Sequence, residues 1–267
     1  MKKPTAFLFT IASAFTLASA SGQTAIAPPQ IGFIQDRMGS FRQISGLAGN
    51  FILGPAALTG VVSAAFSGSF AFIKTNPSIQ VTDAQGHMLA TVGAPGGPAQ
   101  FAFSADGHPA LAYVTNSNAL FQWTGGTLVS TPLDSAIGSD RVWSIAAPDP
   151  EHAAFLVERP DGLWNIRVLL ATGKIDSQAA LPGLNAPALL LANGVIVSTE
   201  PNGLLVTAPD ASQIHIAAQL PRTFSLQQIG DGWLQLQDLA KLSRTRDLAV
   251  RVVQNHAGIY TLPEVAQ

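Results

Sequence analysis

Five acidic or amide residues stand where apolar, strand-like runs of the chain give way to turns. They are Asp36, Asn116, Glu158, Glu200 and Gln237. Carboxylate and amide oxygens bind hard cations when several of them converge on one point. The same residue types also occupy solvated turns, and the segments that begin at Glu158 (Glu-Arg-Pro-Asp-Gly) and at Glu200 (Glu-Pro-Asn-Gly) have turn composition. The composition favours the turn interpretation, because spacing alone shows no convergence.

Other chemistry has less support in the residues. The histidines show no metal-binding i, i+4 spacing, and each is better explained as a solvated turn or strand residue; they are His87, His108, His152, His215 and His256. The sequence contains no Gly-x-Ser-x-Gly nucleophile motif. It also contains no cysteine, which excludes disulfides, thiolate metal sites and a cysteine nucleophile. We therefore assign no catalytic residue and no metal site from the sequence.

Six hairpin-like segments must position the polar residues. Each is an apolar run, a polar turn and a second apolar run rich in Val, Ile, Leu and Phe, which is typical of strands. The segments span residues 31–44, 70–83, 111–123, 154–168, 194–207 and 233–253. Asn-Gly and Asp-Gly pairs between the runs supply the positive φ angles that tight hairpin turns need.

The spacing of these segments predicts the fold. Repeat units begin near Val61, Ala99, Val142, Pro187 and Phe224, at intervals of roughly 40 residues, which is the length of four short strands with their turns. A four-stranded antiparallel unit of this size is one blade of a β-propeller. The sequence therefore predicts an all-β fold, a single β-propeller of six blades, with five or seven as alternatives.

The first unit is shorter than the others. It runs from about residue 31 to residue 58. Circular propellers commonly close by building one blade from both ends of the chain. We therefore expect a terminal strand near residues 258–262 to complete the first blade.

The first twenty residues have the three parts of a secretory signal. Lys2 and Lys3 precede an apolar stretch from Ala6 to Leu17, and Ala18-Ser19-Ala20 supplies small residues before a cleavage site at Ser21. An uncleaved membrane anchor is the alternative, although the stretch is short for a spanning helix. We expect a signal peptide over residues 1–20, a flexible lead-in over 21–30 and a propeller domain over 31–267.

Composition limits the classes of partner. Of 267 residues, 47% are hydrophobic and only 11% are charged, and the net charge is -2. A weakly acidic chain offers no electrostatic attraction to nucleic acid or to anionic lipid. The sequence favours a compact β-rich body over a disordered chain.

Two stretches resemble the repeats of bacterial YVTN-type, WD-repeat-like β-propellers. Residues 79–92 resemble the strand-Asp-x-x-Gly-strand part of that repeat, and residues 97–116 resemble the part that follows. Tyr113-Val-Thr-Asn116 matches the tetrapeptide that names the family, whereas Ala105 replaces the family's proline before Asp106-Gly107. The resemblance implies a propeller and leaves the activity open, because one fold supports many functions.

Two functions follow as hypotheses. The first is an exported module, periplasmic or secreted, that binds an envelope or extracellular protein or a small ligand, with no cofactor, no nucleic acid and no membrane span after signal cleavage. The second follows from the resemblance alone, which extends to lactonases of related shape. It is a lactonase-like hydrolase with Ca²⁺ or a polar site in the central channel. The sequence leaves the question of an enzyme open and leans against it.

Overall fold

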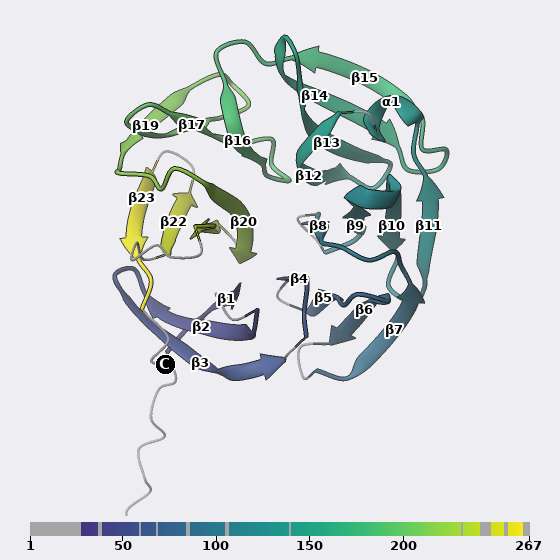
Figure 1. Ribbon diagram of the computed structural model, residues 1–267, viewed down its shortest axis with the longest axis horizontal. Helices are drawn as coiled ribbons and strands as arrows, with labels where there is room; N and C mark the ends of the chain where they lie inside the picture. Colours follow the sequence, from purple (N-terminus) through teal and green to yellow (C-terminus); the bar gives the residue numbers. More distant parts are fainter. Residues whose placement is uncertain are drawn as a thin grey trace, which may run out of the picture.

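The chain forms a ring of six antiparallel β-sheets around a central axis (Figure 1). The computed structural model describes residues 28–36, 39–58, 60–67, 69–83, 86–104, 107–138, 140–230, 232–240, 247–253 and 256–263. Within these residues the architecture is the predicted six-bladed propeller. The expected signal peptide lies outside the described residues, and so do the basic residues Lys241, Arg244 and Arg246.

The first three sheets come from the N-terminal half of the chain. The first has three strands: β1 (Gln30–Gln35), β2 (Phe41–Leu47) and β3 (Asn50–Leu58). The second has β4 (Ser63–Phe66), β5 (Phe70–Lys74), β6 (Ser78–Asp83) and β7 (Met88–Gly93). The third has β8 (Ala99–Phe103), β9 (Ala110–Val114), β10 (Ala119–Trp123) and β11 (Leu128–Pro132).

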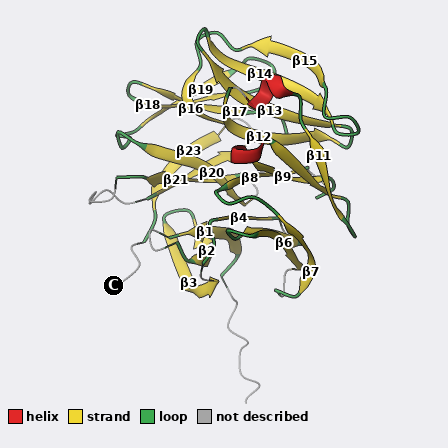
Figure 2. Ribbon diagram, turned by 45° about the vertical axis from the view of Figure 1, so that its right-hand side comes forward, coloured by secondary structure: helices red, strands yellow, loops and turns green. Residues whose placement is uncertain are grey.

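The remaining three sheets follow in chain order. The fourth has β12 (Arg141–Asp149), β13 (His152–Arg159), β14 (Gly162–Leu169) and β15 (Ile175–Ala180). The fifth has β16 (Asn185–Leu190), β17 (Ile196–Glu200), β18 (Gly203–Thr207) and β19 (Gln213–Ala217). The sixth has β20 (Phe224–Gly230), β21 (Trp233–Asp238), β22 (Leu248–Val253) and β23 (His256–Thr261). Two short helices, η1 (Thr115–Ser117) and α1 (Ser135–Gly138), lie among the strands (Figure 2).

Apolar residues fill the spaces between neighbouring blades. Strands β5 and β9 are buried along their whole length, because each blade is covered on both faces by the next ones. One hydrophobic cluster joins β8–β10 to β12–β14, and another joins β16–β19 to β20–β22. The outer strands β7 and β15 are largely exposed. This arrangement explains why the second strands β5, β9 and β13 have continuous rather than alternating buried runs.

The first blade lacks an innermost strand within the described residues. Strand β1 pairs only with β2, and its last residue lies beside β21, the second strand of the sixth blade. The innermost strands of the two flanking blades, β20 and β4, contact each other. Strands β1, β2 and β3 therefore take the second, third and fourth positions of a blade.

The expected closure by a terminal strand is wrong. Strand β23 pairs with β22 and is the outer strand of the sixth blade. The first and last blades instead meet edge to edge, where Gly32 of β1 and Gly230 of β20 approach closely. A Cβ atom on Gly32 would stand 1.6 Å from the carbonyl oxygen of Ile229, and one on Gly230 would stand 1.9 Å from that of Ile31. Only glycine permits this approach of two backbones.

Candidate functional site

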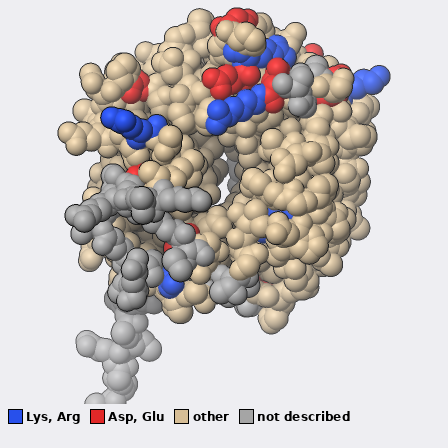
Figure 3. All heavy atoms as spheres, viewed as in Figure 1, with Lys and Arg blue, Asp and Glu red and all other residues tan. Residues whose placement is uncertain are grey.

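The innermost strands enclose a central channel of about 440 Å³. Strands β4, β8, β12, β16 and β20 form five of its sides, and Gln35 of β1 with Gln237 of β21 forms the sixth. The face drawn in Figure 3 is hollowed near its middle. A cavity of this size falls within the range of small-ligand sites.

Amide and hydroxyl side chains supply most of the polar lining. They are Gln35, Ser63, Gln100, Ser144, Ser225, Gln227, Gln228 and Gln237. Among the described lining residues Arg141 is the single charged side chain, and none is Asp, Glu or His. Ca²⁺ sites use carboxylates together with carbonyl oxygens, so this donor set does not fit a calcium centre. Elsewhere in the described chain, too, no three His, Asp or Glu side chains are placed to hold a metal.

An arginine and a tryptophan stand together where β12 begins. The guanidinium carbon of Arg141 lies 3.8 Å from the ring centroid of Trp143, within the range of a cation–π contact. The indole Nε1 of Trp143 donates to Oε2 of Glu158 at 2.9 Å. The register of β12 shifts between Val142 and Ser144, so Arg141 meets Trp143 at an irregularity of the strand. Charged side chains gather over β12–β15 in Figure 3, so this blade carries the most polar part of that face.

The five predicted site residues do not converge on one centre. Gln237 lines the channel, and Glu158 lies next to it through Trp143. Glu200 lies in a separate groove of about 850 Å³ between the fifth and sixth blades and accepts a bond of 2.9 Å from Nδ1 of His215. Asn116, in η1, donates to the carbonyl oxygen of Gly96 at 3.2 Å.

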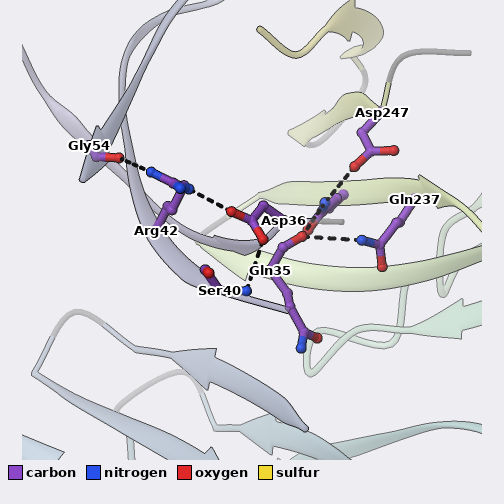
Figure 4. Close-up of polar contacts among 8 residues, drawn as sticks. Gln35, Asp36, Ser40, Arg42, Gly54, Gln237 and Asp247 are labelled. Atoms are coloured by element: carbon purple, nitrogen blue, oxygen red, sulfur yellow. Dashed lines mark hydrogen bonds and ion pairs between the residues drawn. The ribbon is translucent and has the colours of Figure 1, made fainter. Parts of the chain in front are cut away.

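Asp36 is buried and bound within its own hairpin. Its Oδ2 accepts from Nε of Arg42 at 2.6 Å, and its Oδ1 accepts from the amide of Ser40 at 2.8 Å. Figure 4 shows the carboxylate facing Arg42 and Ser40, while Gln237 donates to the backbone oxygen of Gln35. These bonds give Asp36 a structural role in the turn between β1 and β2.

Replacing Asp36 tests that role. We expect Asp36→Ala to lower the free energy of unfolding by about 2 kcal/mol, because it leaves the partly buried Arg42 guanidinium without its carboxylate. Asp36→Asn keeps an acceptor for Ser40 and should cost about half as much. Urea denaturation measures both. An Asp36→Ala protein as stable as the wild type would contradict a structural role.

Lys74 was missed from the sequence, although it ends β5 at the position that Glu158 and Glu200 take in their own blades. Its side chain is fully buried, and Nζ donates to the carbonyl oxygens of Thr75 and Asn76. Burial lowers the pKa of Lys74 below its usual value of 10.5, because desolvation disfavours the ammonium ion. Lys74 stands beside a polar turn, and the sequence there is the same as would surround a lysine whose side chain is exposed to solvent. The sequence alone therefore does not predict its burial.

The lowered pKa of Lys74 predicts a pH dependence of stability. Between this pKa and 10.5 the unfolded chain holds more protons than the folded chain, so the free energy of unfolding rises with pH in that window. Lys74→Met removes the ionisation. We expect the stability of the wild type relative to Lys74→Met to rise from neutral pH towards pH 10, by about 1.4 kcal/mol for each unit of pKa lowering. Urea denaturation at several pH values measures this difference in stability. A difference that does not change with pH would contradict the lowered pKa.

The comparisons with known proteins find similar structures but no similar sequence. No protein-family model and no curated protein matches the sequence. A protein of unknown function from Bacteroides caccae is 12% identical with a TM-score of 0.52, over 84% of this chain and 90% of that one. PorZ, a surface component of the type-IX secretion system of Porphyromonas gingivalis, is 14% identical with a TM-score of 0.49, over 88% of this chain and 31% of PorZ. The C-terminal WD40 domain of Sif2 is 12% identical with a TM-score of 0.44, over 88% of this chain and 82% of that one.

At these identities the likeness shows the fold alone. The chain is a six-bladed β-propeller, and its structural neighbours include WD40 domains. The specific resemblance to YVTN-type repeats stays a prediction. None of the helices in the described part of the chain is long and apolar enough to cross a membrane.

Proposed function

We propose that this protein is an exported binding module that takes its ligand or partner at the central channel. The observation that carries the proposal is an open cavity with Arg141 and Trp143 in its lining. Aromatic and arginine side chains are the residue types that contribute most to binding at protein surfaces. The partner class is an envelope or extracellular protein, or a small ligand, in the periplasm or outside the cell.

The lactonase-like alternative gains no support from the channel. Its described lining offers amide and hydroxyl groups and one guanidinium, with no carboxylate or imidazole to act as a general base. Enzymatic activity of this site is not part of the proposal.

Site-specific cross-linking tests the binding surface. A photoreactive phenylalanine analogue replaces Trp143 in one variant and Val129, an exposed residue of the outer strand β11, in the control. Irradiation in envelope extract should give cross-linked products from position 143 and none from position 129. Equal products from both positions, or none from either, would contradict binding at the channel.

The proposal that the protein is exported is based on the sequence of residues 1–20. Expression of the whole chain with mass spectrometry of the mature N-terminus checks it, and we expect the chain to begin at Ser21. An intact Met1 in protein recovered from the cytoplasm would overturn this part of the proposal.

A further inference from the structure

We infer that the channel binds a small organic carboxylate, with Arg141 as the group that holds its anionic end. The inference rests on the proposed function and adds the chemical class of the ligand. It follows from the charge of the lining, from the open hydrogen-bond donors of Arg141, and from glutamine acceptors in the lining, of which Oε1 of Gln100 has no partner.

Arg141 differs from the other arginines whose guanidinium groups bind carboxylates. Arg42 pairs with Asp36, Arg159 pairs with Asp140 at 2.8 Å, and Arg167 pairs with Asp149 at 2.7 Å. No acceptor in the described chain lies within hydrogen-bond distance of the Arg141 guanidinium, although that side chain is held against Trp143. Arg141 is exposed, and a guanidinium that lies against an aromatic ring with open donors is suited to a carboxylate.

Glu158 orients this pair. Its carboxylate accepts from the indole of Trp143, and no ion pair joins it to Arg141. The bond fixes the ring on which the guanidinium lies, so the positive end of Arg141 stays open to a ligand. Glu158 thereby acts as a positioning residue.

The glutamines of the channel leave acceptors for the rest of the ligand. Nε2 of Gln100 donates to the carbonyl oxygen of Val142 at 2.8 Å, and Nε2 of Gln237 donates to that of Gln35 at 3.2 Å. A carbonyl oxygen only accepts, so the nitrogen of each amide makes these bonds and Oε1 lies on the other side of the amide group. Oε1 of Gln100 is buried with no hydrogen-bond partner.

The two ends of the site together define the ligand. Arg141 is suited to bind an anion, whereas the Oε1 atoms of Gln100 and Gln237 accept hydrogen bonds from hydroxyl or amide N–H donors. A buried acceptor without a partner is costly, and a ligand donor would satisfy it. A hydroxylated or amide-bearing carboxylate that fits about 440 Å³ meets both requirements. Sugar acids and short peptides with a free carboxyl end share this chemistry.

Fluorine NMR on protein labelled with 5-fluorotryptophan tests the inference at Trp143 itself. The Trp143→Phe variant assigns the signal. Galacturonate is compared with galactose, and acetyl-alanyl-alanine is compared with its C-terminal amide, so each acid has a neutral partner of the same shape. We expect one acid to shift the Trp143 signal with saturation, and its neutral partner to bind at least about tenfold more weakly. The acid that shifts the signal shows whether the ligand is a sugar acid or a peptide with a free carboxyl end.

Two variants make the assignment specific. Arg141→Gln should weaken binding of the acid at least about tenfold. Arg159→Gln is the matched control, since Arg159 lies 5.0 Å from the ring of Trp164 in the same blade but is already bonded to Asp140 and Gln178. Its binding should equal that of the wild type, with thermal melts confirming that both variants fold.

The results separate this inference from the proposed function. Equal binding of acids and neutral partners, no binding of either acid, or equal loss in both arginine variants would overturn the carboxylate site. Cross-linking from position 143 would in those cases still support binding at the channel. Loss of the cross-link as well would overturn the proposed function itself.

Discussion

Gly32→Ala should lower the free energy of unfolding by about 3 kcal/mol or more, the largest effect expected of a single methyl group in this chain. The added Cβ would stand 1.6 Å from the carbonyl oxygen of Ile229, so the backbones of β1 and β20 must separate. This is the contact at which the first and last blades close the ring. For a chain of this size the midpoint of thermal unfolding should fall by roughly 6–12 °C.

Gly93→Ala is the matched control for the closure. Gly93 also lies in a strand, at the end of β7, but no atom stands within 4 Å of a Cβ built on it. We expect that substitution to leave stability within about 0.5 kcal/mol of the wild type. Gly230→Ala should resemble Gly32→Ala, because its Cβ would meet Ile31 across the same contact. Wild-type stability of Gly32→Ala would show that the ring does not close here.

Gln235→Leu should lower the free energy of unfolding by about 2 kcal/mol. The Gln235 side chain is fully buried, and its Oε1 accepts from Nε2 of Gln227 at 2.8 Å. Its Nε2 donates to the backbone oxygen of Gln35 at 3.2 Å and to Oδ2 of Asp247 at 3.3 Å. Leucine fills the volume but makes none of these bonds, and it leaves buried polar atoms unsatisfied between the first and last blades.

Gln237→Leu provides the comparison for Gln235→Leu. Gln237 also bonds to the backbone oxygen of Gln35, but it is half-buried and has one protein partner there. We expect a cost of about 0.5–1 kcal/mol, because water can reach its former partner. Urea denaturation of both variants measures the difference. Equal losses would mean that the buried network at Gln235 contributes nothing beyond a single hydrogen bond.

The blade pattern was predictable because it is local. The six hairpin segments of the sequence are the second and third strands of the observed blades, from β1–β2 to β21–β22. The predicted unit starts near Ala99 and Phe224 coincide with β8 and β20. Apolar runs, Asn-Gly and Asp-Gly turns and a steady period are properties of short segments, so they are readable without the fold.

The candidate site was only partly predictable. Equivalent positions along the repeat do not give equivalent surroundings. Asp36 pairs with Arg42, Asn116 bonds to Gly96, and Gln237 alone of the five lines the channel. Arg141 carried only part of a signal: a charged residue two positions before a tryptophan shares its face in a regular strand, but the register of β12 shifts between Val142 and Ser144. That signal gains meaning only when the strand is known to line the channel.

The sequence by itself determined the four-stranded blade and favoured six of them over five or seven, because strand pairing within a hairpin depends on neighbouring residues. Only the tertiary structure decided how the ring closes and what faces its axis. Gly32 meets Gly230 although the two are far apart in the chain, and Gln35 meets Gln235 and Gln237. Such contacts depend on how six sheets pack around one axis, which no local pattern encodes.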